Sequence, residues 1–322
     1  MKTNMPRPDS PLRIGTRGSP LALAQAYETR DRLMVAHGLS QDCFTIAVIK
    51  TSGDLIQDRP LSEVGGKGLF TKEIEEALLA DEIDIAVHSM KDMPVDQPNG
   101  LMLDCYLPRE DVRDAFLSPN YADLAALPKG AKIGTSSLRR RAQILYRRPD
   151  LQVVEFRGNV QTRLRKLEEG IAACTFLAMA GLNRLGVANL ARAPVDINEM
   201  LPAVAQGAIG IELRADDVGT RLLLGAIHHA PTGQRLAAER AFLRALDGSC
   251  QMPIAGLAEL DGDQLHLRGE ILRPDGSECL TMEHRGHVAD AAAMGTALGE
   301  ALLAKAGPNF FNTSLNNPPE IP

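Results

Sequence analysis

Apolar segments of strand length alternate with amphipathic helical segments through most of the chain, and this alternation restricts the fold more than any other feature. A strand is expected at 12–16, followed by a helix from about 21 to 36 that begins after Ser19 and ends at Gly38. Further strands are expected at 43–50 and 208–213, and a strand at 132–134 is followed by a helix from about 138 to 147. Strands that alternate with helices in this way are typical of open α/β sheets.

The pattern changes after position 250. Strands are expected at 254–260, 265–272 and 279–285, joined by Asp-Gly turns, and a helix over 290–306 follows them. This part of the chain is therefore expected to form a small α+β domain.

The bulk properties disfavour several classes of protein. A net charge of −6 argues against non-specific nucleic-acid binding. The sequence lacks a run of about 18 apolar residues, so no membrane span is expected. Residues 1–12 lack the apolar core of a secretory signal, which predicts a cytoplasmic protein. The five cysteines are widely spaced without a Cys-x-x-Cys pair, a pattern that suggests neither a zinc site nor a disulfide framework.

A basic segment stands out in this acidic chain. Between Lys129 and Lys166, eleven basic and two acidic residues give a charge of +9, which leaves −15 on the rest of the chain. Arg139 and Arg140 fall in the first turn of a predicted helix, where the macrodipole disfavours each cation by ~0.3–1 kcal/mol. Such a violation is expected where function requires it. Together with the free amides of 135–137, these side chains predict an anion site.

Two further helix starts carry arginines. Arg157 and Arg163 lie on either side of the cap Asn159, and Arg17 precedes Ser19. Three such starts predict a ligand with several carboxylates or phosphates, and arginine suits the planar carboxylate.

A buried strand over 83–88 delivers polar residues at its carboxyl end, which in open α/β sheets lines the ligand crevice. Asp92, beside Lys91, could stabilise positive charge or shuttle protons. A turn-forming Asp before Pro94 explains the local sequence equally well. His88 lies on the apolar strand and is expected to be a core histidine rather than a base.

Two loops remain open to more than one interpretation. The segment 65–70 is rich in glycine but lacks the spacing of a phosphate loop, so we interpret it as a mobile loop that carries one cation, Lys67. Cys250 lies in a turn between a helix and a strand, where a thiol can be reactive. Its local sequence alone favours a structural cysteine.

Nine motifs, taken together, resemble those of the porphobilinogen deaminases (hydroxymethylbilane synthases). They are, in chain order, GTRGSPLA at 15–22, KTSGD at 50–54, GGKGLF at 65–70, HSMKD at 88–92, GTSSLRR at 134–140, RGNVQTR at 157–163, AGLNRLG at 180–186, LPAVAQG at 201–207 and GSCQMPI at 248–254. Ala205 and Ser249 stand where the family often has glycine.

The resemblance implies an α/β fold of three domains. Two are lobes with mixed open sheets that resemble the halves of periplasmic binding proteins, and the third is a small α+β domain that carries the cofactor cysteine. The implied boundaries are 1–106 with 203–226, then 107–202, then 227–307. The tail at 308–322, with repeated Asn and Pro, is expected to be disordered.

The resemblance also implies the reaction. Four porphobilinogen molecules are joined head to tail with loss of ammonia, and water then releases hydroxymethylbilane. A dipyrromethane cofactor is implied, covalently bound through Cys250. Porphobilinogen is the implied partner of a monomer that binds neither nucleic acid nor membrane, and no metal is expected.

Residue roles follow from the resemblance, motif by motif. Every pyrrole bears an acetate and a propionate, so the growing chain brings many carboxylates that need cationic partners. Asp92 is the implied catalytic residue, stabilising the azafulvenium cation that forms when ammonia leaves. The other implied residues are Ser89, Lys91, Thr135, Ser137, Arg139, Arg140, Arg163 and Arg184 for the cofactor, Arg17, Ser19, Arg157 and Arg163 for the substrate, and Lys67 and Phe70 on a loop over the cleft.

Two other functions fit part of the sequence. A non-catalytic, two-lobed binder of a small polyanion would explain the sheets and arginines, but neither the third domain nor the turn at Cys250. A nucleic-acid-binding protein would need aromatic residues among the cations of the basic segment. Only Tyr146 and Phe156 lie there, and aromatic residues make up 4% of the chain.

Overall fold

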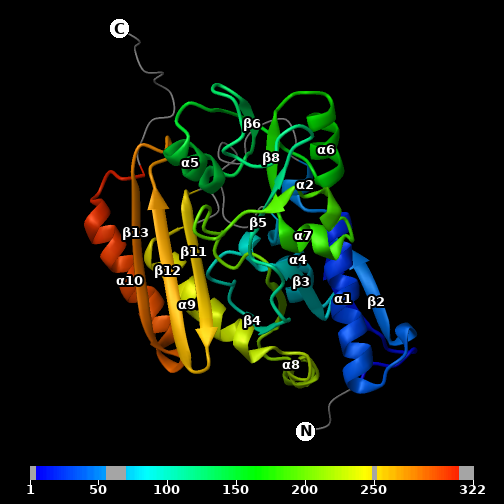
Figure 1. Ribbon diagram of the computed structural model, residues 1–322. Coiled ribbons are helices and arrows are strands. Elements are labelled where there is room, and N and C mark those ends of the chain that lie inside the picture. The colour runs from blue at the N-terminus through cyan, green and yellow to red at the C-terminus, as the bar shows by residue number, and fades with distance from the viewer. Residues whose placement is uncertain (1–4, 56–69, 249–251, 312–322) are drawn as a thin grey trace. The chain divides into compact units, whose positions relative to one another are not determined.

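The computed structural model describes residues 5–55, 70–248 and 252–311 (Figure 1). The chain forms two compact units, each built from several segments. Unit 1 comprises 1–111, 180–187 and 206–234, and unit 2 comprises 112–179, 188–205 and 235–322.

Unit 1 contains a five-stranded mixed sheet in the order β2-β1-β3-β10-β4. Its strands are β1 (Leu12–Thr16), β2 (Phe44–Val48), β3 (Ile85–Ser89), β4 (Leu101–Tyr106) and β10 (Ile209–Arg214). β1 pairs in parallel with β2 and β3, whereas β10 runs antiparallel to β3 and β4. The sequence predicted four of these strands and missed β4.

The helices of unit 1 cover both faces of this sheet. They are α1 (Pro20–His37), α2 (Ser52–Leu55), α4 (Lys72–Leu79), α7 (Met179–Arg184) and α8 (Val218–Gly225), with single 3-10 turns η1 (Gln41–Cys43) and η2 (Met90–Asp92). Ile85 and Val87 of β3 share an apolar cluster with Leu33 of α1, whereas Ala86 shares one with Ile74 of α4. Because alternate strand residues point to opposite faces, α1 and α4 lie on opposite sides of the sheet.

Unit 2 contains a second five-stranded sheet, in the order β7-β6-β8-β5-β9. Its strands are β5 (Asp114–Leu117), β6 (Lys132–Gly134), β7 (Gln152–Val154), β8 (Cys174–Ala178) and β9 (Ala193–Pro194), and its helices are α5 (Leu138–Arg147), α6 (Val160–Glu168) and the 3-10 turn η3 (Ala188–Leu190). β6 pairs in parallel with β7 and β8, and β5 runs antiparallel to β8 and β9. This sheet therefore repeats the strand directions of the sheet in unit 1.

The C-terminal part of unit 2 is a three-stranded antiparallel sheet backed by helices (Figure 1). It contains β11 (Ile254–Asp261), β12 (Gln264–Leu272), β13 (Cys279–His287), the 3-10 turn η4 (Val288–Asp290) and α10 (Ala291–Ala306), with α9 (Ala230–Ala245) preceding it. A Cβ added at Gly269 of β12 would lie 2.7 Å from Phe242 of α9 and 3.0 Å from Leu298 of α10. Both helices therefore pack on the same face of this sheet.

Two structural expectations can be compared with these elements. The expected α/β class is confirmed, with two five-stranded sheets and a small C-terminal domain. The tail was expected to be disordered from Pro308, but Phe310 is only 2% exposed and its ring lies 4.9 Å below the Arg273 guanidinium. Burial of this ring places residues 308–311 against the C-terminal part of unit 2. Residues 312–322 lie outside the described residues. Within the described parts of the chain, no helix combines the length and apolar character needed to span a membrane.

Candidate active site

A pocket in unit 1 lies where β1 and β3 end. Five of the residues predicted from the sequence line it: Arg17, Ser19, Phe70, Ser89 and Asp92. They come from three segments that are far apart in the chain. The arrangement is the one expected at the carboxyl ends of strands in an open α/β sheet.

The segment after β1 places the first cation of this pocket. The Ser19 hydroxyl accepts a hydrogen bond from the Ala22 amide at 3.2 Å and so caps α1, with Pro20 at its first position. The guanidinium of Arg17 lies 4.2 Å from the centre of the Phe70 ring, within the range of a cation–π contact. The pocket therefore presents a cation beside an aromatic ring and a helix N-terminus.

The segment after β3 places the carboxylate. Ser89 ends the strand, and its hydroxyl accepts a hydrogen bond from the Gln25 amide at 2.8 Å. The chain then turns through η2, which contains Lys91 and Asp92. Asp92 is exposed, so its carboxylate is accessible to a ligand in the pocket.

His88 is buried, as expected, but it also lines this pocket, which was not expected. Its Nε2 lies 3.1 Å from Oε2 of Glu212 on β10, and Glu212 is fully buried. Glu212 was not among the residues predicted from the sequence. A glutamate inside the apolar strand 208–213 was the available signal.

In unit 2, Arg139 and Arg140 share a buried carboxylate that the sequence analysis also missed. Asp114 Oδ2 accepts from Arg139 Nη2 at 2.8 Å, and Oδ1 accepts from Arg140 Nη2 at 2.7 Å. Burial alone would raise the pKa of Asp114, but the two guanidiniums outweigh it and hold that pKa well below its usual range. This carboxylate compensates for the unfavourable position of two cations in the first turn of α5.

Asp114 does not saturate these two guanidiniums. Arg139 also donates to Gln143 and to the Leu201 carbonyl, yet its buried Nε finds no partner among the described residues. Glu270 is a second buried carboxylate near Arg139, but an unpaired buried donor is still costly unless something accepts from it. The arrangement fits an anionic ligand.

Arg163 adds a further positive charge. Burial, together with the nearby Arg140, lowers the pKa of Arg163 to about 10. Its Nε donates to the Gly158 carbonyl at 2.9 Å, at the start of α6. Arg157 is 3.9 Å from Glu155, a loose ion pair at a partly exposed position. The guanidiniums of Arg163 and Arg140 repel one another, and such a pair is expected where an anion is bound.

The hydroxyls predicted for the same site belong to the turn between β6 and α5. Thr135 Oγ1 accepts from the Ser137 amide at 3.2 Å, and Ser137 Oγ caps α5 by accepting from the Arg140 amide at 3.4 Å. Thr135 is buried and Ser137 is partly exposed. The turn therefore holds the start of α5, and with it Arg140, in a fixed geometry.

Arg184 lies in unit 1 and has protein partners of its own. Its Nε is 3.2 Å from Oε2 of Glu28 on α1, and its Nη2 donates to the Gly207 carbonyl at 3.1 Å. The side chain is 8% exposed. Glu28 is a partner that the sequence analysis did not anticipate.

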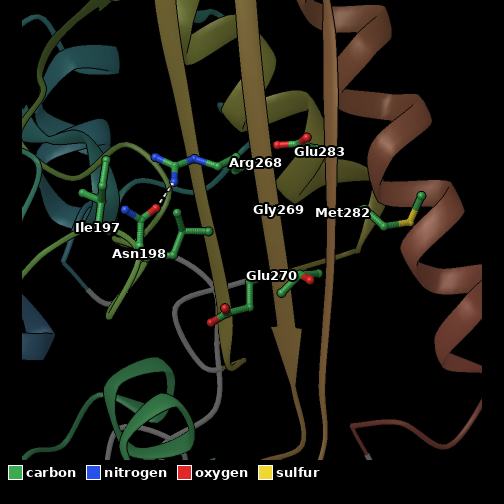
Figure 2. Close-up of a pocket in the computed structure, with 9 residues that line it drawn as sticks. Ile197, Asn198, Arg268, Gly269, Glu270, Met282 and Glu283 are labelled. Atoms are coloured by element: carbon green, nitrogen blue, oxygen red, sulfur yellow. Dashed lines mark hydrogen bonds between the residues drawn. The ribbon is translucent and has the colours of Figure 1, made fainter. Parts of the chain in front are cut away.

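A larger cavity, of about 330 Å³, lies on the sheet of the C-terminal part of unit 2. Figure 2 shows Arg268 of β12 donating to Asn198 beside Glu270 and Glu283, and the Arg268–Asn198 distance is 2.9 Å. Among the described residues, none of those predicted from the sequence lines it.

Two predicted residues, Cys250 and Lys67, lie outside the described residues. The remaining cysteines of the chain, Cys43, Cys105, Cys174 and Cys279, are free thiols. In the parts of the chain that the structure describes, no three His, Cys, Asp or Glu side chains are grouped so as to hold a metal ion.

Comparisons with known proteins point in one direction. The family model described as porphobilinogen deaminase, dipyromethane cofactor binding domain, matches residues 12–221, and that for the porphobilinogen deaminase C-terminal domain matches 234–304. The porphobilinogen deaminase of Paracoccus denitrificans is 67% identical over 312 residues, which cover 97% of this chain and 100% of the relative. That of Nitrobacter hamburgensis is 55% identical over 298 residues, or 92% of this chain and 94% of the relative.

Solved structures that are similar to this chain include periplasmic proteins. A periplasmic substrate-binding protein of an ABC transporter from Coxiella burnetii aligns with a TM-score of 0.41 and 15% identity, over 71% of this chain and 96% of its own. A putative methionine-binding lipoprotein from Bacillus subtilis aligns with a TM-score of 0.41 and 13% identity, over 70% of this chain and 93% of its own. Likeness at this level says nothing about what this chain binds.

Proposed function

Since this chain belongs to the porphobilinogen deaminase family, we propose how its residues divide the reaction of that family. The enzyme is a transferase that condenses four porphobilinogen molecules head to tail, releases ammonia and hydrolyses off hydroxymethylbilane.

The pocket of unit 1 is the proposed site at which porphobilinogen loses ammonia. Asp92 presents an exposed carboxylate in the pocket that Arg17 and Ser19 also line. Loss of ammonia leaves a positive charge on the pyrrole, and a fixed carboxylate stabilises that charge more in the transition state than in the substrate. Arg17 binds a substrate carboxylate, and Ser19 and Ser89 add hydrogen bonds. Phe70 packs against Arg17, and Lys67, three residues earlier in the sequence, is proposed to add a cation for the substrate.

The arginines of unit 2 hold the dipyrromethane cofactor, whose carboxylates match the excess of positive charge there. Arg139, Arg140 and Arg163 supply the guanidiniums, and Thr135 and Ser137 fix the turn that positions them. Arg163 also binds a carboxylate of the incoming substrate. Arg157, Lys91 and Arg184 add further cations for the substrate and cofactor carboxylates. When bound, the cofactor supplies the primer to which new pyrrole units are joined.

Cys250 is the proposed point of attachment, through a thioether. The proposed domains are 1–106 with 203–226, then 107–202, then 227–307, with the cysteine in the third. We further propose that the protein is a cytoplasmic monomer.

The intact mass of the purified protein tests the attachment. We expect an excess equal to two linked porphobilinogen-derived units, and we expect Cys250→Ser to lack it. Added porphobilinogen should then give a ladder of heavier species. A wild-type protein without the adduct, which gains none from porphobilinogen, contradicts the assignment of Cys250.

Asp92→Ala tests the carboxylate. Turnover should fall by at least ~10²-fold, the typical size of a lost electrostatic or acid–base contribution, while the adduct and the thermal unfolding transition are retained. Asp31→Ala removes an exposed carboxylate of α1 that pairs with Arg30 and serves as the control. Near-normal turnover of the Asp92 variant would remove the role proposed for it.

A further inference from the structure

A buried pair of titratable groups lies beneath the pocket of unit 1. His88 is the residue of β3 before its last, on the face that α4 covers, and Glu212 reaches it from the neighbouring strand β10. The exposed fractions of the two side chains are 5% and 0%. His88 nevertheless lines the same pocket as Asp92, so the pair connects the pocket with the interior of the unit.

A purely structural role explains this pair poorly. Oε2 of Glu212 accepts from His88, but its Oε1 is buried and has no hydrogen-bond partner in the described part of the chain. Burying a carboxylate with half of its acceptors unused is unfavourable, and an apolar residue would fill the same space better. The carboxylate gains a strong partner only when the imidazole becomes charged.

The charged groups around His88 favour that change. Glu212 faces it from β10 and Glu75 lies near it on α4, while Asp92 and Arg17 share the pocket. Burial raises the pKa of Glu75, and the Glu212 carboxylate adds to the rise. Glu212 is the buried carboxylate in direct contact with His88 and would compensate an imidazolium there.

We propose that His88, oriented by Glu212, is an acid–base residue of this pocket that takes the proton lost by a pyrrole α-carbon when the new carbon–carbon bond forms. The inference rests on the proposed function, because it needs substrate in the pocket of unit 1. Glu212 holds Nε2–H, which leaves Nδ1 as the basic nitrogen. A carboxylate that fixes the tautomer and stabilises the imidazolium is the arrangement known from Ser-His-Asp sites.

The step balances without any added reactant. The protonated amino group of porphobilinogen leaves its methylene carbon as ammonia, taking the electrons of the carbon–nitrogen bond, and the ring with its methylene is left positively charged. The α-carbon of another pyrrole forms a bond to that methylene carbon. Its C–H electrons restore the aromatic ring, and the proton passes to Nδ1 of His88. The imidazolium then passes this proton to the released ammonia, which departs as ammonium.

Three measurements on His88→Asn and Glu212→Gln test the proposal. His88→Asn should lower kcat by roughly 10²-fold or more with little change in KM, as for a lost general base. Porphobilinogen deuterated at its free α-carbon should then show a larger isotope effect on kcat than with the wild-type enzyme. Glu212→Gln keeps a hydrogen-bond acceptor of the same shape but removes the charge, so the acidic limb of its pH–rate profile should move to lower pH.

A second histidine–glutamate pair provides the matched control. His266 Nε2 lies 2.7 Å from Glu283 Oε2 on the surface of the C-terminal sheet. His266→Asn and Glu283→Gln should leave kcat, the isotope effect and the pH profile unchanged.

Each outcome decides the question. Wild-type kcat, pH profile and isotope effect in both variants overturn the role of His88. If His88→Asn fails to fold, the isosteric Glu212→Gln carries the test alone, and an unchanged pH profile for it overturns the proposal. The adduct mass is read on the same proteins, so a missing adduct in the wild type identifies failure of the proposed function instead.

Discussion

Asp114 is a buried carboxylate that joins two of the arginines of unit 2, Arg139 and Arg140. It is fully buried, and both oxygens accept from guanidiniums, at 2.8 Å from Arg139 and 2.7 Å from Arg140. Removing one partner of a buried ion pair leaves an uncompensated charge, which typically costs ~3–5 kcal/mol. Asp114 is therefore a residue on which both the stability of unit 2 and the position of its anion site depend.

We expect Asp114→Asn to lower the free energy of unfolding by about 3–5 kcal/mol, measured by urea denaturation. Asp150→Asn is the control, because its ion pair with Arg148 lies at the surface, and it should change stability far less. Equal effects of the two variants would show that the buried pair has no special weight.

The same carboxylate predicts a pH dependence. Because the folded-state pKa of Asp114 is depressed, its contribution to stability is fully present above the unfolded-state value of about 3.9. The contribution is lost as the pH falls through the lower folded-state pKa. The stability difference between the wild type and Asp114→Asn should thus persist from neutral pH to about pH 4 and shrink below it. A difference that disappears near neutral pH contradicts this assignment.

At the scale of elements, local sequence predicted those with strong caps or strong periodicity. Helix α5 begins and ends at the expected residues, because Ser137 caps its start and Pro149 follows its end. β4 and β5 were missed because each carries an Asp, a residue type typical of turns, and β5 is only four residues long. The pairing of Asp114 with α5 arises from tertiary contact, so no local pattern revealed it.

The segment leading to β10 contains a backbone conformation that its residue type disfavours. Ala205 has φ +61°, in the left-handed region, and its amide donates to Oε2 of the buried Glu239 at 2.6 Å. This explains why glycine, which the family often has here, suits the position. A left-handed conformation costs an L-residue ~1–2 kcal/mol, which glycine would avoid. The greater conformational freedom of glycine in the unfolded chain would take back ~0.4–1 kcal/mol of that gain in stability.

We therefore expect Ala205→Gly to raise the free energy of unfolding by about 0.5–1 kcal/mol. Ala203→Gly is the matched control two residues earlier, where φ is not positive, and it should lower stability instead. Urea denaturation of both variants measures the difference. A loss of stability in Ala205→Gly would show that the strain at this position is negligible.

For the whole molecule, the family resemblance identified the reaction, whereas the residues supporting the site came from the structure. The motifs named Arg17, Asp92 and Arg139 because they belong to short, ordered stretches of sequence. Glu212 and Asp114 lie on other strands, more than twenty residues from the groups they orient, so only the folded sheets bring them together. The groups proposed to contact the ligand were therefore predictable from the sequence, whereas the carboxylates that orient some of them were not.

Charge distribution gives a prediction for the molecule as a whole. The segment from Lys129 to Lys166 carries +9 in a chain of net charge −6, so an anionic substrate meets a local field opposite to that of the rest of the chain. Salt screens such a field over ~10 Å at 0.1 M. The KM for porphobilinogen should therefore rise roughly several-fold between low and high salt, with a smaller change in kcat.

Variants of two arginines of α6 distinguish the effect of this field on KM from the effect of direct contact with the ligand. Arg163→Gln and Arg165→Gln change the net charge equally, but Arg165 is 69% exposed and pairs with Glu169, whereas burial lowers the pKa of Arg163. If Arg163 binds a carboxylate directly, its loss removes a charge-assisted hydrogen bond worth ~1.5–3 kcal/mol and raises KM by roughly 10- to 100-fold. Arg165→Gln should raise KM less than about two-fold, through the field alone. Steady-state kinetics over a salt series measures both, and equal effects would mean that total charge, rather than a built carboxylate site, governs binding.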